Sequence, residues 1–221
     1  MSPSVSLSGP TAEPAAGGPA HQLVVLLHGV GAGGDDLIGI ASLVADLLPH
    51  AAFVAPDGPF AYDLAPFGRQ WFSLQDRSPA ALSAGVRAAV PPLEAYVEAQ
   101  LRARGLDGAA LALVGFSQGT MTALHMALRR ASPCAAVVGF SGALLDPVRL
   151  PDEVRSRPRV LLVHGDADEV VNPACLGQAE AALAAVGVPV LAEMRPGLGH
   201  GIDGPGLALA GHFLRQSFGL E

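Results

Sequence analysis

The sequence contains no lysine, only two cysteines and one tryptophan, and charged residues make up just 15% of the chain. All 13 basic residues other than histidine are arginine, against 20 acidic ones, which gives a formal net charge of −7. This acidic balance argues against nucleic acid or an anionic membrane surface as the main partner. Cys134 and Cys175 are too few for a disulfide framework and lack the spacing of metal ligands. We therefore expect free thiols in a reducing compartment.

Long apolar runs are also missing. No stretch approaches about 18 uninterrupted apolar residues, so no segment is predicted to span a membrane. Residues 1–20 are rich in serine, proline, alanine and glycine and have no apolar core, which excludes a signal peptide. Ser2 stands where N-myristoylation requires glycine. We expect a cytoplasmic protein with a flexible leader over residues 1–20 and one folded domain over 21–221.

Half of the residues are hydrophobic, and from residue 21 onward short apolar runs alternate with longer amphipathic stretches. The runs predict strands near 23–27, 51–55, 111–114, 135–140, 160–163 and 189–194. The stretches predict helices near 36–48, 92–104, 118–130, 173–186 and 205–217, with Pro92 and Pro173 in first turns. This alternation is typical of an α/β domain with a mostly parallel central sheet and helices on both faces.

Residues 57–79 interrupt the alternation. The segment holds five aromatic residues, namely Phe60, Tyr62, Phe67, Trp71 and Phe72. Loops of this length are uncommon in compact domains and are often functional. The segment is predicted either to serve the active site or to plug one edge of the sheet. Its apolar residues are compatible with acyl binding and with a homodimer contact.

A G-x-S-x-G pattern at residues 115–119 lies between a predicted strand and a predicted helix. Such a turn must be tight, and Gly115 and Gly119 are small enough to allow it. The turn exposes the Ser117 hydroxyl at the carboxyl edge of the sheet, where α/β folds bind ligands. We predict Ser117 as a nucleophile rather than as a helix N-cap. Ser141 is rejected because its similar pattern has alanine in place of the second glycine.

A serine nucleophile needs a base, and an imidazole base needs a carboxylate that fixes its tautomer. The expected chain order is serine, acid, histidine. His200 follows the last predicted strand and lies among glycines, so it is the predicted base. Asp166, Asp168 and Glu169 all follow the strand at 160–163, and spacing alone leaves the acid open, because Asp166 is equally suited to bonding loop amides. The remaining histidines are interpreted as surface, packing or backbone-bonding residues: His21, His28, His50, His125, His164 and His212.

An acyl-transfer site must also stabilise an oxyanion, usually with two backbone N–H groups. The residue after the nucleophile, Gln118, is expected to supply one. Val30, in the glycine-rich loop 28–34 after the first strand, is expected to supply the other.

The same loop also reads as G-x-G-x-x-G, with Asp57 ending the next strand, as in a nicotinamide-dependent oxidoreductase. Asp35 and Asp36 disfavour this alternative, because they would repel a pyrophosphate at the following helix. It also leaves the serine, acid and histidine placements unexplained.

Together these motifs resemble the phospholipase/carboxylesterase family of the α/β-hydrolase superfamily, which includes the acyl-protein thioesterases, and most of all its small bacterial esterases. The matching segments read Leu-His-Gly-Val-Gly, Gly-Arg-Gln-Trp-Phe, Gly-Phe-Ser-Gln-Gly, His-Gly-Asp-Ala-Asp-Glu-Val-Val and Gly-His, at residues 27–31, 68–72, 115–119, 164–171 and 199–200. The resemblance implies a single-domain α/β-hydrolase fold.

The resemblance also implies roles for individual residues. It places the acid at Asp168 rather than Asp166, supports Val30 and Gln118 as oxyanion donors, and places Trp71 with Phe72 beside the substrate. Trp71 is equally well suited to anchor the long segment in the core. The implied protein is a serine carboxylesterase without cofactor or metal, acting on small short- to medium-chain esters. A lysophospholipase or acyl-protein thioesterase is the alternative.

Overall fold

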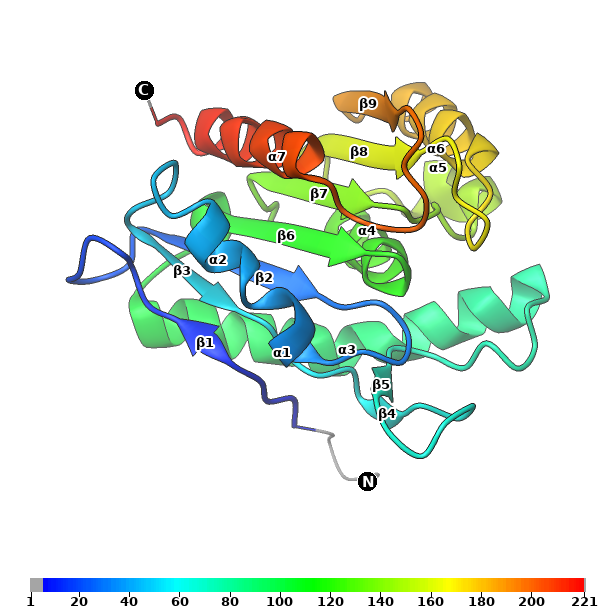
Figure 1. Ribbon diagram of the computed structural model, residues 1–221, viewed down its shortest axis with the longest axis horizontal. Coiled ribbons are helices and arrows are strands. Elements are labelled where there is room, and N and C mark those ends of the chain that lie inside the picture. The colour runs from blue at the N-terminus through cyan, green and yellow to red at the C-terminus, as the bar shows by residue number, and fades with distance from the viewer. Residues whose placement is uncertain (1–5, 221) are drawn as a thin grey trace.

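The computed structural model describes residues 6–220 and has three layers, with a central sheet between two layers of helices (Figure 1). The sheet has seven strands in the order β1-β3-β2-β6-β7-β8-β9. All neighbouring pairs except β1 and β3 are parallel. All six strands predicted from the apolar runs are present: β2 (Gln22–Leu27), β3 (Ala51–Val54), β6 (Leu111–Phe116), β7 (Ala136–Phe140), β8 (Arg159–Gly165) and β9 (Val190–Arg195).

The helices divide between the two faces of the sheet (Figure 1). One face carries α1 (Gly34–Leu37), α2 (Ile40–Leu43) and α7 (Gly204–Ser217). The other carries α3 (Pro79–Arg104), α4 (Gln118–Arg129) and α6 (Ala174–Ala185). The remaining elements are the hairpin of β4 (Phe60–Ala61) and β5 (Arg69–Gln70), the short helix α5 (Leu150–Glu153) and two 3-10 turns, η1 (Gly108–Ala110) and η2 (Pro147–Arg149). Within residues 6–220, no helix combines the length and the apolar character that crossing a membrane requires.

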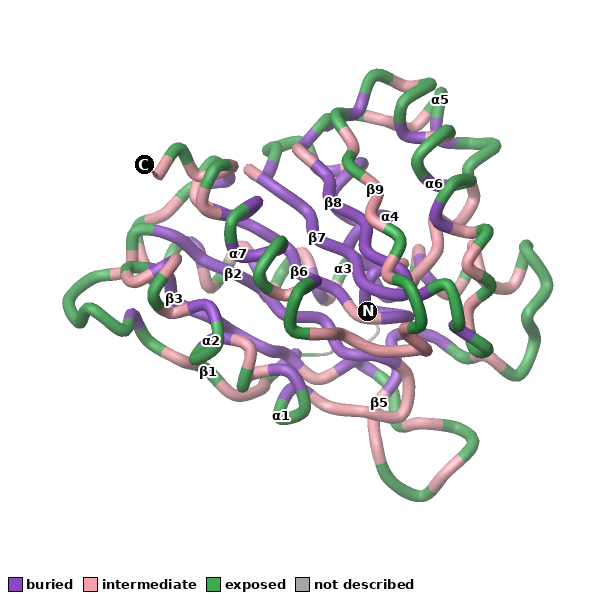
Figure 2. Tube along the Cα trace, turned by 45° about the horizontal axis from the view of Figure 1, so that its top comes forward, coloured by how far each residue is buried: buried purple, intermediate pink, exposed green. Residues whose placement is uncertain are grey.

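The inner strands β2, β3, β6, β7 and β8 are buried on both faces, as Figure 2 shows along the centre of the molecule, whereas the edge strand β9 is partly exposed. In β2, the side chains of Leu23 and Val25 contribute to the core under α3 and α4. Val24 and Leu26 contribute to the second core, under α2 and α7. Two cores on one sheet explain why these strands read as continuous apolar runs instead of alternating with polar residues.

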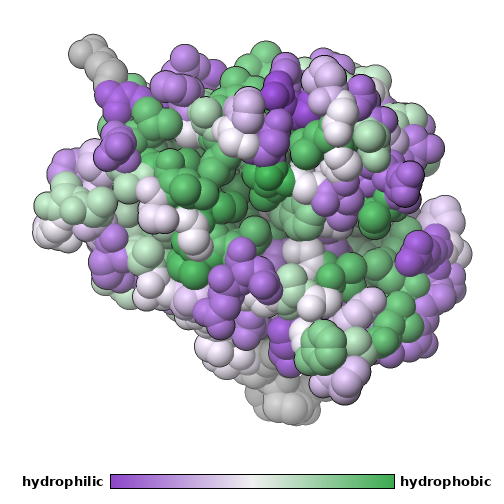
Figure 3. Space-filling view, viewed as in Figure 1, coloured by the Kyte–Doolittle hydropathy of each residue, from purple (hydrophilic) through white to green (hydrophobic). Residues whose placement is uncertain are grey.

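The two helical layers cover the sheet unequally. On the face seen in Figure 3, apolar side chains gather over α2 and between α2 and α7. Leu43 on α2 is 70% exposed there. The short helices α1 and α2 bury fewer side chains than the long helix α3 does on the opposite face.

The leader predicted over residues 1–20 is wrong for its described part. Thr11 and Ala12 form β1 (Thr11–Ala12), which pairs antiparallel with β3. The Asp57 amide donates a hydrogen bond of 2.9 Å to the Ser8 carbonyl, and Leu7 lies in the core. Residues 6–20 therefore belong to the domain, because main-chain hydrogen bonds hold them to its edge. Such bonds require no particular side chains and so leave no pattern in the sequence. Residues 1–5 lie outside the described residues.

Two predicted helices have different bounds. The helix expected over 92–104 begins at Pro79, where the Ser78 hydroxyl accepts a hydrogen bond from the Ala81 amide. Pro91 and Pro92 lie inside α3 and not at its start, where their missing N–H groups interrupt the main-chain bonding. The helix expected over 36–48 is reduced to the two short helices α1 and α2. The proline signal at Pro92 therefore misplaces the start of α3.

Candidate active site

Ser117 lies on a sharp turn between β6 and α4, as predicted from its motif. Its backbone has φ 53° and ψ −117°, a conformation that residues other than glycine rarely adopt. A Cβ atom on Gly119 would collide with the Leu27 carbonyl, and one on Gly115 would collide with the Thr120 amide. Strand and helix can therefore approach closely only with glycine at both positions. Backbone strain of this kind clusters at functional sites.

Asp168 and His200 meet through a direct hydrogen bond. His200 Nδ1 lies 2.8 Å from Asp168 Oδ2, while Asp168 Oδ1 accepts bonds of 2.8 and 2.9 Å from the Val170 and Val171 amides. Burial raises the pKa of Asp168, but the hydrogen bonds from His200 and the two amides outweigh it, so this pKa lies below its usual value. An ionised Asp168 holds the His200 proton on Nδ1 and leaves Nε2 to accept another.

Asp166 and His164 support this loop from either side. Asp166 Oδ1 accepts a bond of 2.7 Å from the Gly197 amide, which confirms the prediction that it is suited to bonding loop amides. His164 Nε2 lies 3.0 Å from the Val171 carbonyl, which confirms its predicted backbone-bonding role, and 3.1 Å from Asp168 Oδ2. Of the acids that spacing left open, it is Asp168 that bonds to His200.

The loops after β6, β7, β8 and β9 converge at one edge of the sheet. The ring of Phe116, which precedes Ser117, lies 4.9 Å from the His200 ring between centroids. The Ser141 hydroxyl donates a bond of 3.2 Å to the Gly201 carbonyl, next to His200. Ser141 is 0% exposed, which agrees with its rejection as a nucleophile, but Ser117 is itself only 6% exposed, so the exposure predicted for it is slight. This edge thus brings together the segments that carry the three predicted catalytic side chains.

The two predicted oxyanion donors come from neighbouring strands. Val30 follows β2 and Gln118 follows β6, and these strands pair in parallel with Leu27 opposite Gly115. Gln118 is the first residue of α4, where a helical N–H has no partner within the helix. Directly after Val30, the Gly31 amide donates a hydrogen bond of 2.8 Å to the Arg69 carbonyl in β5.

The glycine-rich loop differs from a dinucleotide cradle. Its Gly34 amide donates a bond of 2.8 Å to Asp57 Oδ1, and its Gly33 amide donates one of 2.7 Å to Asp36 Oδ2. A pyrophosphate would need these amides free and the carboxylates absent. Asp57, which completes the nicotinamide-binding pattern in the sequence, instead caps the start of α1.

Trp71 and Phe72 are core residues, and the substrate-binding role predicted for them is corrected. Their exposed fractions are 0% and 1%. The Trp71 indole Nε1–H donates a bond of 2.9 Å to the His28 carbonyl. With their rings enclosed by the core, neither offers a surface to a substrate, so the alternative interpretation of Trp71 as an anchor of the long segment is the one that fits.

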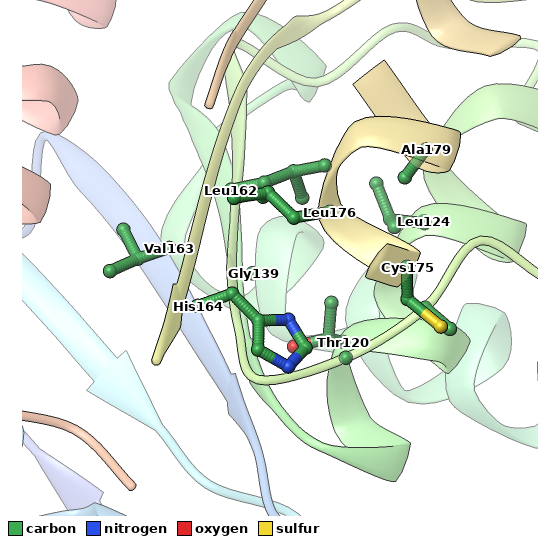
Figure 4. A pocket seen from close by; sticks show the side chains of 11 residues that line it. Thr120, Leu124, Gly139, Leu162, Val163, His164, Cys175, Leu176 and Ala179 are labelled. Atoms are coloured by element: carbon green, nitrogen blue, oxygen red, sulfur yellow. The ribbon is translucent and has the colours of Figure 1, made fainter. Parts of the chain in front are cut away.

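A small pocket lies behind the Asp168 loop, between α4, α6 and the ends of β7 and β8 (Figure 4). Thr120, Leu162, His164, Cys175 and Leu176 are among the residues that line it. The pocket has a volume of about 210 Å³, but this volume includes space that is open to solvent. Its enclosed part has room for only about one water molecule. It is therefore too tight for an acyl chain.

Both cysteines are free thiols, as expected from their number. Burial raises the pKa of the Cys134 thiol to about 12, so this side chain behaves as an apolar core residue. Among residues 6–220, no three or more histidine, cysteine, aspartate or glutamate side chains gather closely enough to hold a metal ion.

Comparison with known proteins extends over nearly the whole chain. A model of the phospholipase/carboxylesterase family matches residues 13–218. Esterase YpfH of Escherichia coli (strain K12) is 32% identical over 199 residues, which cover 90% of this chain and 84% of that protein.

Solved structures agree with this match. The crystal structure of esterase PE8 superposes with a TM-score of 0.91 at 40% sequence identity and covers 96% of this chain and 99% of that chain. The crystal structure of Zea mays acyl-protein thioesterase 2 superposes with a TM-score of 0.74 at 25% identity and covers 95% of this chain and 98% of that chain. The fold predicted from the motifs, a single-domain α/β hydrolase, is confirmed.

Proposed function

Because the chain belongs to the phospholipase/carboxylesterase family of carboxylic ester hydrolases, we propose that it cleaves short- to medium-chain esters through Ser117, His200 and Asp168. The observation that carries the proposal is the bond of 2.8 Å between His200 and a buried Asp168. The His200 ring also contacts Phe116, the residue before the serine on the strained turn. A histidine oriented by a carboxylate is the arrangement that activates a serine hydroxyl.

In the proposed mechanism, the Ser117 Oγ attacks the acyl carbon while His200 Nε2 takes its proton. The negative charge that develops on the carbonyl oxygen is stabilised by the Val30 and Gln118 N–H groups. His200 then protonates the leaving alcohol, and the ester bond breaks to give an acyl-enzyme. A water molecule then attacks the acyl carbon while His200 Nε2 takes its proton. His200 returns this proton to the Ser117 Oγ as the acyl–serine bond breaks, and the acid leaves. Asp168 stabilises the imidazolium in both halves.

The second candidate function is that of a lysophospholipase or acyl-protein thioesterase. The similarity to an acyl-protein thioesterase structure favours it. Its chemistry would use the same residues, and only the length and the leaving group of the substrate would differ. The hairpin of β4 and β5 bears on that difference, because Phe60, Leu64 and Phe67 are 43%, 58% and 75% exposed on this segment. They offer an apolar surface to an acyl chain or to a second copy of the chain.

The proposal is tested by the hydrolysis of p-nitrophenyl esters from acetate to palmitate, with wild type and Ser117→Ala side by side. We expect maximal kcat/KM at short to medium chains and a loss of about 10⁶ in kcat for Ser117→Ala at an unchanged Tm. A maximum at the longest chains would favour the second candidate. Near-normal turnover by Ser117→Ala would overturn the assignment of the nucleophile.

A further inference from the structure

Trp71 links the two segments that carry the proposed oxyanion donors. Its indole Nε1–H donates a bond of 2.9 Å to the His28 carbonyl, at the end of β2. Its backbone N–H donates a bond of 2.8 Å to the side-chain Oε1 of Gln118, at the start of α4. One residue thus reaches both sides of the place where an ester carbonyl must sit.

These bonds lie in the interior of the protein. Trp71 and His28 are 0% exposed, and Gln118 is 1% exposed. The Trp71 and His28 rings also contact each other, with centroids 5.4 Å apart. A hydrogen bond shielded from water is stronger than an exposed one, and the partner left behind when it is removed is costly to bury. The link is therefore stiff.

Neighbouring residues strengthen each end of the link. The Gln118 side chain also donates from Nε2 to the Phe72 carbonyl, at 2.8 Å, so that its amide is held by two consecutive residues. Beyond Val30, Gly31 donates to Arg69 at 2.8 Å, and Arg69 donates to Ala32 at 2.8 Å. The segment around Trp71 therefore holds the Val30 loop on both sides.

Oxyanion stabilisation depends on where the two donors point, since each must lie within about 3 Å of the developing charge. Strand pairing fixes β2 against β6 only as far as Leu27 and Gly115, and both donors lie beyond that point. Resting on the function proposed above, we propose that Trp71 is a positioning residue that fixes the spacing between the N–H groups of Val30 and Gln118. Trp71 itself touches no substrate.

The test is Trp71→Phe, which keeps an aromatic ring but removes the indole N–H and leaves the His28 carbonyl without that donor. We expect kcat for the preferred p-nitrophenyl ester to fall about ten- to a hundredfold, with KM changed less than about twofold. Hydrogen exchange followed by mass spectrometry should show faster exchange in the peptide that spans residues 26–33. This second readout does not depend on catalysis.

Phe213→Leu is the matched control. Phe213 is another buried aromatic residue, 4% exposed, but it lies on α7 in the second core. We expect this variant to lower Tm and to leave kcat and the exchange of residues 26–33 unchanged. If Trp71→Phe merely lowers Tm in the same way, or alters neither kcat nor the exchange, the positioning role is wrong.

Gln118→Leu provides a second variant in case Trp71→Phe does not fold. It retains the backbone N–H of Gln118 and removes the side-chain acceptor of Trp71, so the same fall in kcat and faster exchange are expected. A wild-type protein inactive on every ester would contradict the proposed function, whereas the exchange readout would still decide the role of Trp71.

Discussion

Two regions meet at the carboxyl edge of the sheet and are built on different principles. In the loops after β8 and β9, the groups proposed to do the chemistry are side chains, and Asp168 bonds directly to His200. In the segment of residues 57–72, side chains such as Trp71 are buried supports, and the groups proposed to act are backbone amides of other segments. A sequence motif therefore reveals the groups that do the chemistry, whereas it does not reveal which buried side chains position the backbone amides.

The largest effect is expected from removing one charge in the first region, the loops after β8 and β9. Asp168→Asn should lower kcat by about 10⁴, because an amide that donates to His200 selects the wrong tautomer. Asp166→Asn, two residues away, is the matched control. It weakens only a bond to the Gly197 amide and should cost less than about tenfold. Steady-state kinetics and Tm of both variants check the prediction, and equal losses would contradict the assignment of the acid.

A second prediction concerns the segment of residues 57–72 and the pH dependence of the stability that its contact with His28 provides. Burial lowers the pKa of His28, whose Nε2 accepts a bond of 2.8 Å from the Gly58 amide. The unfolded chain, with a histidine pKa of about 6.5, therefore binds this proton more readily than the folded protein does. The contribution of His28 to stability should be complete above that pH and should be lost as the pH falls below it.

His28→Gln, which keeps an acceptor for Gly58, should reduce this loss of stability between about pH 7 and pH 5 and lower kcat about tenfold. Urea denaturation at both pH values measures the first effect. His125→Phe is the control: burial lowers the pKa of His125 to about 4, and this residue lies on α4. It should also reduce the pH dependence of stability, but it should leave kcat unchanged. If His28→Gln also left kcat unchanged, His28 would have no role in positioning the catalytic groups.

The smallest effect is expected at the exposed tip of the same segment. Phe67→Ser should change the free energy of unfolding by no more than about 0.5 kcal/mol, because this side chain is 75% exposed. It should leave kcat for the acetate ester unchanged. Size-exclusion chromatography and the ester series then separate the two uses of the surface: a change in elution volume indicates a contact between copies, and a higher KM for long esters alone indicates acyl binding.

The sequence predicted the strands well because a strand buried on both faces must be apolar throughout, as β2 is. It misplaced the start of α3, since Pro91 and Pro92 resemble a helix start but lie within the helix. It also missed β1, whose two residues join the sheet through main-chain bonds that any side chain would permit.

Within the site, spacing could not separate Asp166 from Asp168, because both follow the same strand. The resemblance favoured Asp168, and the geometry pairs that residue with His200. For Trp71, the sequence leaves open whether it lies beside the substrate or anchors the long segment in the core, and its burial favours the anchor. Its contact with His28 joins residues 43 positions apart in the chain, and no local pattern encodes such a contact.

Covalent labelling can show whether Ser117 is the nucleophile of an ester hydrolase. Wild type and Ser117→Ala would each be treated with an alkyl fluorophosphonate, which phosphonylates activated serines, and the adduct would be located by mass spectrometry of peptides. We predict one adduct, on Ser117, that forms in step with the loss of esterase activity and is absent from Ser117→Ala. Inactivation with the adduct on another residue, Ser141 for example, would contradict the assignment of Ser117 as the nucleophile.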